Sequence, residues 1–300
     1  MLSILIPTYN DDLHPLLESL YRSDELENIA FEVLVFNDNS TLPFTISGSY
    51  RNLQIIESAV NVGRTAARHN LAKAATYDWL LFLDSDVEIY NNDFISNYLE
   101  VIRRKDVDVC FGGYAYNPAV YNERVSLRYH YGIAKEQIPA NVRNKNPYKV
   151  IISGNFIILK ETFLSLPLHE QTVYYGLDNY FGSLLKERHV PVIHIDNAVY
   201  HNGLDTNEKY LEKKERAAET LVKLYESGKM KHHNNDLLAT FEKIVNLHLI
   251  TFFTFLYKVL GPGLKKNMLG PSPSIKQLQV YRLLYICSYY KKGQKANKTI

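Results

Sequence analysis

The first two-thirds of the chain alternates short apolar segments with segments of helical periodicity. LSILIP (2–7), FEVLVF (31–36) and DWLLFL (78–83) are almost continuously apolar, as expected of strands that are covered on both faces. Between them, leucines and alanines recur at helical spacing in residues 11–22 and 63–75. This alternation predicts an α/β fold built on a mostly parallel sheet.

The same pattern continues to about residue 205 and then changes. Residues 115–148 are rich in Tyr, Asn and Pro and predict a long loop, while charged and apolar helices are expected over 206–226 and 236–260. The turn-rich segment 261–274 predicts a loop before a last apolar segment at 277–290. We therefore expect an α/β domain over residues 1–205 and a basic helical C-terminal extension over 206–300.

The net charge of +2 conceals an uneven distribution along the chain. No Asp or Glu follows Glu242, whereas residues 243–300 contain ten Lys and Arg. Residues 1–242 therefore contain 24 of the 34 basic residues and all 32 acidic residues, which gives this part a net charge of −8. A basic end on an acidic body indicates an anionic partner, either nucleic acid or an anionic membrane surface. Nothing in the first 200 residues supports nucleic acid, so we expect none.

The two cysteines, Cys110 and Cys287, lie among apolar neighbours and are too few for a disulfide framework. Buried free thiols suit a reducing compartment. The first ten residues, MLSILIPTYN, lack the charged and long apolar regions of a secretory signal. We therefore expect a cytoplasmic protein, with peripheral attachment at the inner face of the membrane as an open alternative.

Three polar clusters follow expected strands at the point where each strand ends. They are Pro7-Thr8-Tyr9-Asn10, Asn37-Asp38-Asn39-Ser40 and Asp84-Ser85-Asp86. Ligands of open α/β sheets bind outside the carboxyl ends of the strands, so these clusters should line one crevice. Tyr9 could stack on a base and Asp38 could accept a hydrogen bond from a base N–H. The sequence therefore suggests a nucleotide site.

The paired aspartates Asp84 and Asp86 indicate a divalent cation. Two adjacent carboxylates repel each other unless a positive charge neutralises them. Mg²⁺ or Mn²⁺ prefers such oxygen ligands, usually also binds substrate phosphates, and stabilises a diphosphate leaving group. A solvated turn or a helix cap is the structural alternative for this spacing.

The chain resembles inverting family 2 glycosyltransferases of the GT-A fold over roughly residues 2–203. The resemblance is carried, in the family's order, by LSILIPTYN, VLVFNDNST, NVGRTAARHN, LLFLDSD (the Asp-x-Asp motif) and YYGLDNYFG (the Glu-Asp motif). It implies a nucleotide-diphospho-sugar transferase-like sheet with a nucleotide-sugar half at about 1–113 and an acceptor half at about 114–205. It also implies that the nucleotide sugar contacts Pro7, Thr8, Tyr9, Asp38, Arg64, Arg68, Asp84 and Ser85. For Arg64 and Arg68, exposed positions on a helix are the alternative.

The resemblance further implies a general base and a metal site. Asp178 matches the family's base, which removes the proton of the acceptor hydroxyl during direct, inverting attack; a helix N-cap is the structural alternative. Asp86 is the implied principal metal ligand, and His201 either completes the site or is a structural histidine. Two residues depart from the family pattern: Asn37 replaces an aspartate, and Leu177 replaces the Glu that tends to touch the acceptor.

These features predict a metal-dependent (Mn²⁺ or Mg²⁺) inverting glycosyltransferase of hexosyltransferase type. The expected donor is a nucleoside diphosphate sugar, most simply a UDP-sugar, and the acceptor is a hydroxyl of a glycan or lipid-linked glycan in polysaccharide or glycoconjugate synthesis. A sugar-nucleotide nucleotidyltransferase and a silent nucleotide-sugar binding module are the alternatives. PTYNDD lacks the Gly-rich basic loop of the former.

The apolar segment 244–257, IVNLHLITFFTFLY, is too short to span a membrane, which takes ~20 apolar residues. It predicts either a buried helix that caps the catalytic domain or an interfacial helix. In the second case Phe252, Phe253 and Phe255 would enter the membrane, while Lys243, Lys258, Lys265 and Lys266 would meet anionic headgroups. The same helices could instead form a homo-oligomer.

Overall fold

The computed structural model describes residues 1–168 and 175–297 and contains two compact units. The first unit is assembled from three stretches of chain: Met1–Asn117, Glu136–Val173 and Glu187–Gly203. The second unit contains Pro118–Lys135, Tyr174–Lys186 and Leu204–Ile300. The chain therefore leaves the first unit twice and returns each time, and it leaves a third time after Gly203.

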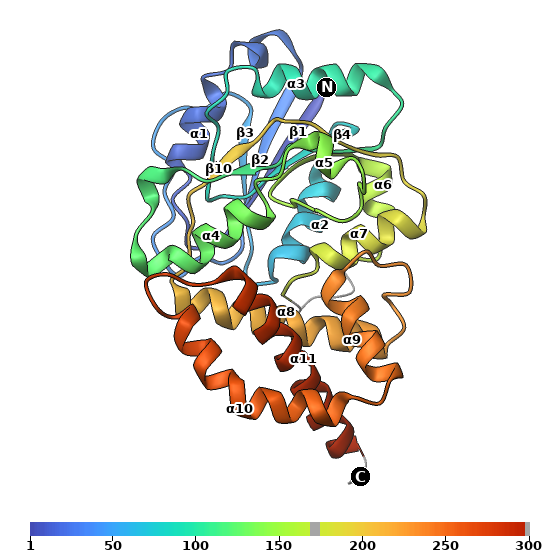
Figure 1. Ribbon diagram of the computed structural model, residues 1–300. Coiled ribbons are helices and arrows are strands. Elements are labelled where there is room, and N and C mark those ends of the chain that lie inside the picture. Colours follow the sequence, from blue (N-terminus) through green and yellow to red (C-terminus); the bar gives the residue numbers. More distant parts are fainter. Residues whose placement is uncertain (169–174, 298–300) are drawn as a thin grey trace. The chain divides into compact units, whose positions relative to one another are not determined.

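The first unit is built on a seven-stranded sheet with the strand order β3-β2-β1-β4-β8-β6-β9. Figure 1 labels its strands β3, β2, β1 and β4. All neighbouring strands pair in parallel except β8, which is antiparallel to both β4 and β6. This arrangement confirms the prediction of a mostly parallel α/β sheet. The strands are β1 (Leu2–Thr8), β2 (Phe31–Asn37), β3 (Leu53–Glu57), β4 (Trp79–Leu83), β6 (Val109–Phe111), β8 (Asn155–Leu159) and β9 (Val192–His194).

Among its described residues, the first unit also contains a smaller sheet and six short helices. The small sheet has the order β5-β10-β7, formed by Val87–Glu88, Val199–His201 and Tyr114–Ala115. Every residue of β1 is buried, which explains its continuously apolar sequence. Helix α2 packs against β1 and β2 through Ala67, Leu71 and Ala72. The helices are α1 (His14–Tyr21), η1 (Asp24–Asn28), α2 (Arg64–Ala74), α3 (Phe94–Arg104), α5 (Ala140–Arg143) and α6 (Lys160–Ser165).

The described part of the second unit is helical. Its buried core contains Leu127, Tyr210, Leu211, Met268, Leu278 and Tyr281. Helices α10 and α11 lie side by side within it (Figure 1). The elements are η2 (Pro118–Val120), η3 (Glu123–Val125), α4 (Ser126–Lys135), α7 (Asp178–Glu187), α8 (Asn207–Glu226), α9 (Asp236–Asn246), α10 (Ile250–Met268) and α11 (Ile275–Asn297).

The prediction that residues 115–148 form a long loop was wrong, because this segment contains α4 and α5. A buried asparagine of α8, Asn207, stabilises the start of α4. Its side-chain oxygen accepts a hydrogen bond from the Leu127 N–H at 2.8 Å, and its amide donates to the Glu123 carbonyl at 2.9 Å. The contact joins residues about 80 positions apart, which is why local sequence patterns do not reveal it.

The loop predicted over 261–274 was also wrong for its first half, because α10 continues through Pro262 to Met268. A proline inside a helix removes one backbone hydrogen bond. Here the next turns carry Leu264 and the fully buried Met268, which pack into the core of the second unit. This tertiary packing outweighs the local preference for a turn. The helix predicted at 236–260 is interrupted near His248, whose φ is 59°.

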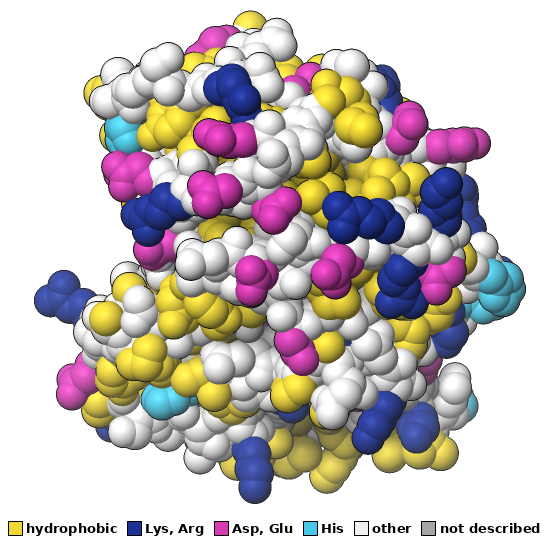
Figure 2. Space-filling model, turned by 90° about the horizontal axis from the view of Figure 1, so that it is seen from above, with side chains coloured by type: hydrophobic (Ala, Val, Ile, Leu, Met, Phe, Trp, Pro, Cys, Tyr) yellow, Lys and Arg dark blue, Asp and Glu magenta, His cyan; other side chains and the backbone are white. Residues whose placement is uncertain are grey.

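The expectation of buried free cysteines is met in the described residues. Cys110 and Cys287 are free and buried. On the face drawn in Figure 2, acidic and basic side chains are interspersed, with hydrophobic side chains between them. Within residues 1–168 and 175–297, no helix combines the length and the apolar character needed to cross a membrane.

Candidate functional site

The carboxyl ends of β1, β2 and β4 meet at one cavity of about 190 Å³ in the first unit. The register of the sheet explains this, because β1 lies between β2 and β4 and pairs with both in parallel. All three predicted polar clusters reach the cavity, and Arg68, His201 and Asp178 are the predicted residues that do not line it. The lining residues are Pro7, Thr8, Tyr9, Asp11, Asp38, Arg64, Ala67, Asp84, Ser85 and Asp86.

The loops after β1 and β2 are held together by an asparagine, Asn10. Its side-chain oxygen accepts hydrogen bonds from the N–H groups of Thr41 and Leu42 at 2.8 and 3.0 Å, and its backbone N–H donates to Ser40 Oγ at 2.9 Å. Asn10 has a φ of 61°, a left-handed conformation that asparagine tolerates better than most residues. These contacts join residues about 30 positions apart and hold the two loops together at the rim of the cavity.

Asp38 is buried, and its carboxylate holds the turn that leads into α2. It accepts hydrogen bonds from the backbone N–H of Val62 at 2.7 Å and of Gly63 at 2.8 Å. Gly63 has a φ of 83°, a conformation that favours glycine, and it immediately precedes α2. A carboxylate can accept about four hydrogen bonds, so these two amides leave capacity for a base N–H.

Two further side chains give the cavity a buried hydroxyl and an exposed aromatic ring. The Thr8 hydroxyl is buried, and among the described residues no group forms a hydrogen bond with it. Tyr9 is 43% exposed and lines the cavity. A buried hydroxyl that lacks a partner is costly, so a polar ligand group at Thr8 would be favourable. An exposed ring can stack on a base.

Asp84 is nearly buried and is surrounded by positive charge. Arg68 donates to its Oδ1 at 2.6 Å, Arg64 donates to its Oδ2, and the Tyr114 hydroxyl donates to Oδ2 at 3.0 Å. Burial by itself would raise the pKa of the Asp84 carboxyl. The two guanidiniums, with smaller contributions from His201 and Tyr114, outweigh burial and hold this pKa well below its usual range.

Replacing Asp84 with asparagine should therefore destabilise the protein. Arg68, with a side chain that is 10% exposed, would lose its carboxylate partner while remaining buried. Breaking such a pair costs about 3–5 kcal/mol in the free energy of unfolding, measured by chemical denaturation. The pKa of Asp84 is lower in the folded than in the unfolded state. The loss of unfolding free energy should therefore be complete above about pH 4 and should disappear as the pH falls towards the folded-state pKa.

The matched control is Asp106→Asn, which removes an aspartate from an exposed ion pair with Arg104 at 2.9 Å. Exposed pairs contribute little to stability, so this variant should unfold like the unsubstituted protein. Equal stability of the Asp84→Asn and Asp106→Asn proteins would contradict a stabilising role for the buried cluster.

Asp86 faces His201, with Oδ2 and Nε2 separated by 3.6 Å. Two ligands of one cation lie at about this separation when each bonds the ion at ~2.1 Å. Gly203 lies so close to Asp86 that a Cβ at this position would collide with the carboxylate. The described part of the chain contains no group of three or more His, Cys, Asp or Glu side chains placed to hold a metal ion together. The two donors fit an ion that also binds phosphate and water.

Sequence reasoning missed two residues of this site. Asp11 lines the cavity and accepts a hydrogen bond from the Ser85 hydroxyl. Its position directly after the first polar cluster was a usable signal. Tyr114 reaches Asp84 from the small sheet, and burial raises the pKa of its hydroxyl well above the ordinary value. No sequence pattern connects Tyr114 with a residue 30 positions earlier.

The structure explains why an asparagine, Asn37, stands where the family pattern has an aspartate. Its side-chain amide donates to Glu57 Oε2 at 2.7 Å, and its side-chain oxygen accepts from the Ser40 N–H at 3.1 Å. An aspartate at position 37 would place two carboxylates in contact, which is unfavourable. The carboxylate of Glu57 therefore favours an amide over a carboxylate at position 37.

Asp178 belongs to the second unit, where it begins α7 and is partly exposed. The Leu177 carbonyl accepts a hydrogen bond from the Phe181 N–H at 2.8 Å, which is the first helical bond of α7. Leu177 is 8% exposed, so the residue that replaces the family's Glu contributes an apolar side chain to packing. The neighbouring Asn179 accepts from the Asn235 amide at 2.7 Å. The roles of Asp178 and of the cavity residues remain predictions.

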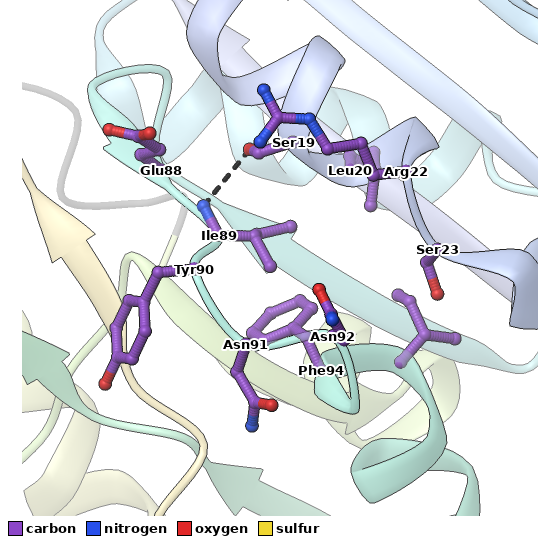
Figure 3. A pocket seen from close by; sticks show the side chains of 11 residues that line it. Ser19, Leu20, Arg22, Ser23, Glu88, Ile89, Tyr90, Asn91, Asn92 and Phe94 are labelled. Atoms are coloured by element: carbon purple, nitrogen blue, oxygen red, sulfur yellow. Dashed lines mark hydrogen bonds between the residues drawn. The ribbon is translucent and has the colours of Figure 1, made fainter.

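A second cavity of about 220 Å³ in the first unit has a different character (Figure 3). It lies between α1 and the segment after β5, and Ser19 bridges these elements by accepting a hydrogen bond from the Ile89 N–H at 3.1 Å. Its one lining carboxylate, Glu88, accepts a hydrogen bond from Asn202 at 2.8 Å. It contains none of the predicted residues, so the smaller cavity is the candidate site.

Comparison with known proteins finds relatives with short matches. An uncharacterized glycosyltransferase of Haemophilus influenzae is 36% identical over 89 residues, which cover 29% of this chain and 29% of the relative. An uncharacterized glycosyltransferase of Escherichia coli, YibD, is 31% identical over 96 residues, covering 30% of this chain and 27% of the relative. The matched segments thus span less than a third of these curated relatives.

The fold is shared with a solved mannosyltransferase from Pyrobaculum calidifontis, determined in complex with GDP-Man and Mn²⁺. The two align with a TM-score of 0.53 and 15% identity over 75% of this chain and 64% of the mannosyltransferase. The family model described as "Glycosyl transferase family 2" matches residues 3–165, more than half of the chain. This match confirms the resemblance that the sequence motifs indicated: the chain belongs to glycosyl transferase family 2.

Proposed function

We propose that the protein is a metal-dependent, inverting glycosyltransferase. In this proposal it transfers a hexose-type sugar from a nucleoside diphosphate donor, with UDP-sugars as first candidates, to a hydroxyl of a glycan or lipid-linked glycan in polysaccharide or glycoconjugate synthesis. The cavity at the ends of β1, β2 and β4 carries the proposal, because it gathers an aromatic ring, buried hydrogen-bonding groups, paired carboxylates and a guanidinium.

Each part of the donor has a chemically suitable neighbour in the cavity. Tyr9 would stack on the base, Asp38 would accept from a base N–H, and the Thr8 hydroxyl would bond the ribose. Arg64, whose side chain is 50% exposed, would offset the charge of the diphosphate. The mannosyltransferase of similar fold was solved with GDP-Man, which supports a nucleotide-sugar donor and makes guanine a second base to test.

Asp86 and His201 would hold the metal ion, in keeping with the Mn²⁺ in the complex of the mannosyltransferase. When bound, the ion would neutralise charge on the departing diphosphate. Asp86 supplies the hard anionic oxygen and His201 a neutral ring nitrogen, a donor set suited to Mn²⁺. Gly203 keeps space free beside the Asp86 carboxylate.

Asp178 would act as the general base. Its carboxylate would take the proton of the acceptor hydroxyl while the acceptor oxygen bonds the anomeric carbon. The bond from that carbon to the diphosphate oxygen would break on the opposite face, and the bonding electrons would leave with the nucleoside diphosphate. One displacement inverts the configuration at the anomeric carbon.

A lipid-linked acceptor would require the enzyme to work close to a membrane. We therefore also propose peripheral attachment at the cytoplasmic, inner face of an anionic membrane. The basic segment from Lys243 onward, which has no acidic residue, supports this attachment. A homo-oligomer that uses the same segment is the competing arrangement.

The test is a panel of nucleotide sugars, including UDP- and GDP-linked hexoses, incubated with the purified protein in Mn²⁺, Mg²⁺ or EDTA. Transferases of this kind release donor slowly to water, so one donor should yield its nucleoside diphosphate, and EDTA should abolish the release. Thermal shifts with the same panel report binding independently of turnover. If no donor stabilises the protein or is consumed, the proposed function is wrong. Binding without turnover in the presence of acceptor glycans would identify a binding module.

A further inference from the structure

Helix α10 is apolar on two of its faces. One face packs against α11: the ring of Tyr257 lies 5.8 Å from that of Tyr281 and 5.9 Å from that of Tyr285. On the same side, Thr254 donates a hydrogen bond to the Cys287 carbonyl at 3.4 Å, and Met268 is fully buried. This face therefore fixes α10 firmly within the second unit.

The other face of α10 is exposed although it carries large apolar side chains. Phe252, Phe255 and Val259 follow one another at intervals of three and four residues, which places them on one stripe of the helix. Phe253, in contrast, is only partly exposed. We call the exposed set the docking face: Leu249 (40% exposed), Phe252 (54%), Phe255 (60%), Val259 (58%) and Leu260 (46%). Contiguous exposed apolar residues of this kind mark an interaction surface.

Exposed lysines lie on the same helix as the docking face and on the helix before it. Lys258 and Lys266 on α10 and Lys243 on α9 are exposed. From Lys243 to Asn297 the chain contains no Asp or Glu. On the face drawn in Figure 2, by contrast, charges of both signs are mixed. Phenylalanine and leucine on one face of a helix with lysines beside them are typical of helices that lie in the interface of an anionic bilayer.

We propose that the docking face binds the surface of a bilayer that contains anionic phospholipids, with α10 lying in the plane of the membrane. Phe252 and Phe255 would enter the acyl boundary, while Lys258 and Lys266 would remain among the phosphates. The inference deepens the proposed membrane attachment by naming the surface that makes it. The inference rests on the proposed membrane attachment alone and does not depend on which nucleotide sugar the protein binds.

The experiment is flotation of the full chain with vesicles of phosphatidylcholine, with and without phosphatidylglycerol. We expect binding to the anionic vesicles, weakened by high salt. The double variant Phe252→Ser and Phe255→Ser should lose about tenfold or more in affinity, because two large apolar side chains no longer leave water. The double variant Lys258→Gln and Lys266→Gln should lose roughly thirtyfold in affinity for anionic vesicles, at about 1 kcal/mol for each lysine, and nothing for neutral ones.

The matched control is Val142→Ser with Ile133→Ser, which removes apolar side chains that are 48% and 42% exposed outside the docking face. This control should bind vesicles like the unsubstituted chain. Thermal shifts with nucleotide sugars, measured on all variants, separate loss of docking from loss of the donor site. The proposal fails if the unsubstituted chain does not float with anionic vesicles, or if the phenylalanine variant floats equally well. It also fails if that variant instead converts a dimer to a monomer in size-exclusion chromatography.

Discussion

Asp178→Asn should reduce the turnover number by about 10²–10⁴-fold while leaving donor binding intact. The amide is nearly the same size as the carboxylate but cannot take the proton of the acceptor hydroxyl. The Asp178 side chain lies in the first turn of α7, where a negative charge contributes less than about 1 kcal/mol to the helix. Folding should therefore survive the change. Initial rates with saturating donor and acceptor would measure the loss.

The control for this substitution is Glu208→Gln, which makes the same chemical change in the first turn of α8. Both variants lose one negative charge at a helix start, so both should show a similar small change in melting temperature. Only Asp178→Asn should lose turnover. If the two variants keep equal activity, Asp178 is a helix residue and the base lies elsewhere.

Asp86→Ala should weaken binding of the metal ion strongly, because it removes the proposed principal ligand of that ion. We expect donor hydrolysis and transfer to fall by about 100-fold or more, because a bound cation contributes several kcal/mol to stabilising charge on the leaving group. Titration with Mn²⁺, followed by the change in melting temperature, should show a weaker response than in the unsubstituted protein. His201→Ala should also reduce donor turnover and the response to Mn²⁺, but by less than Asp86→Ala does.

Asp93→Ala is the appropriate comparison for Asp86→Ala. Asp93 is an exposed aspartate at the start of α3 that makes no capping hydrogen bond through its side chain. The variant should respond to Mn²⁺ and turn over donor normally. If Asp86→Ala behaves in the same way, the metal is held by other groups, and the role we assign to the second aspartate of the DSD motif is incorrect.

The sequence predicted the central sheet well because its signals are local. Continuous apolar runs mark β1, β2 and β4, and the polar cluster after each run reaches the same cavity because these strands are parallel neighbours. The contacts of Asp84 could not be predicted in the same way. Tyr114 approaches it from the small sheet, and Gly154 lies so close that any Cβ would collide with its carboxylate. Such contacts depend on the packing of distant segments.

Two predicted loops failed for a related reason. Tyrosine, asparagine and proline in residues 115–148 favour irregular backbone, and Gly261 and Pro262 favour a turn. The helices form there because Leu127 and Met268 reach the core of the second unit, and local propensity is small compared with burial of a large apolar side chain. Hydrophobic positions at helical spacing were thus a better guide than glycine and proline.

The antiparallel strand β8 has a consequence for how this architecture can be inherited. It lies between β4 and β6, so the sheet that shapes the cavity is continuous only when residues 155–159 have joined strands encoded much earlier. Residues 1–113 lack this strand, and a fragment ending there would leave β4 with an open edge. The segment 1–113 is therefore not a portable module. Gene fusion or recombination would have to carry it together with the chain that returns through β8.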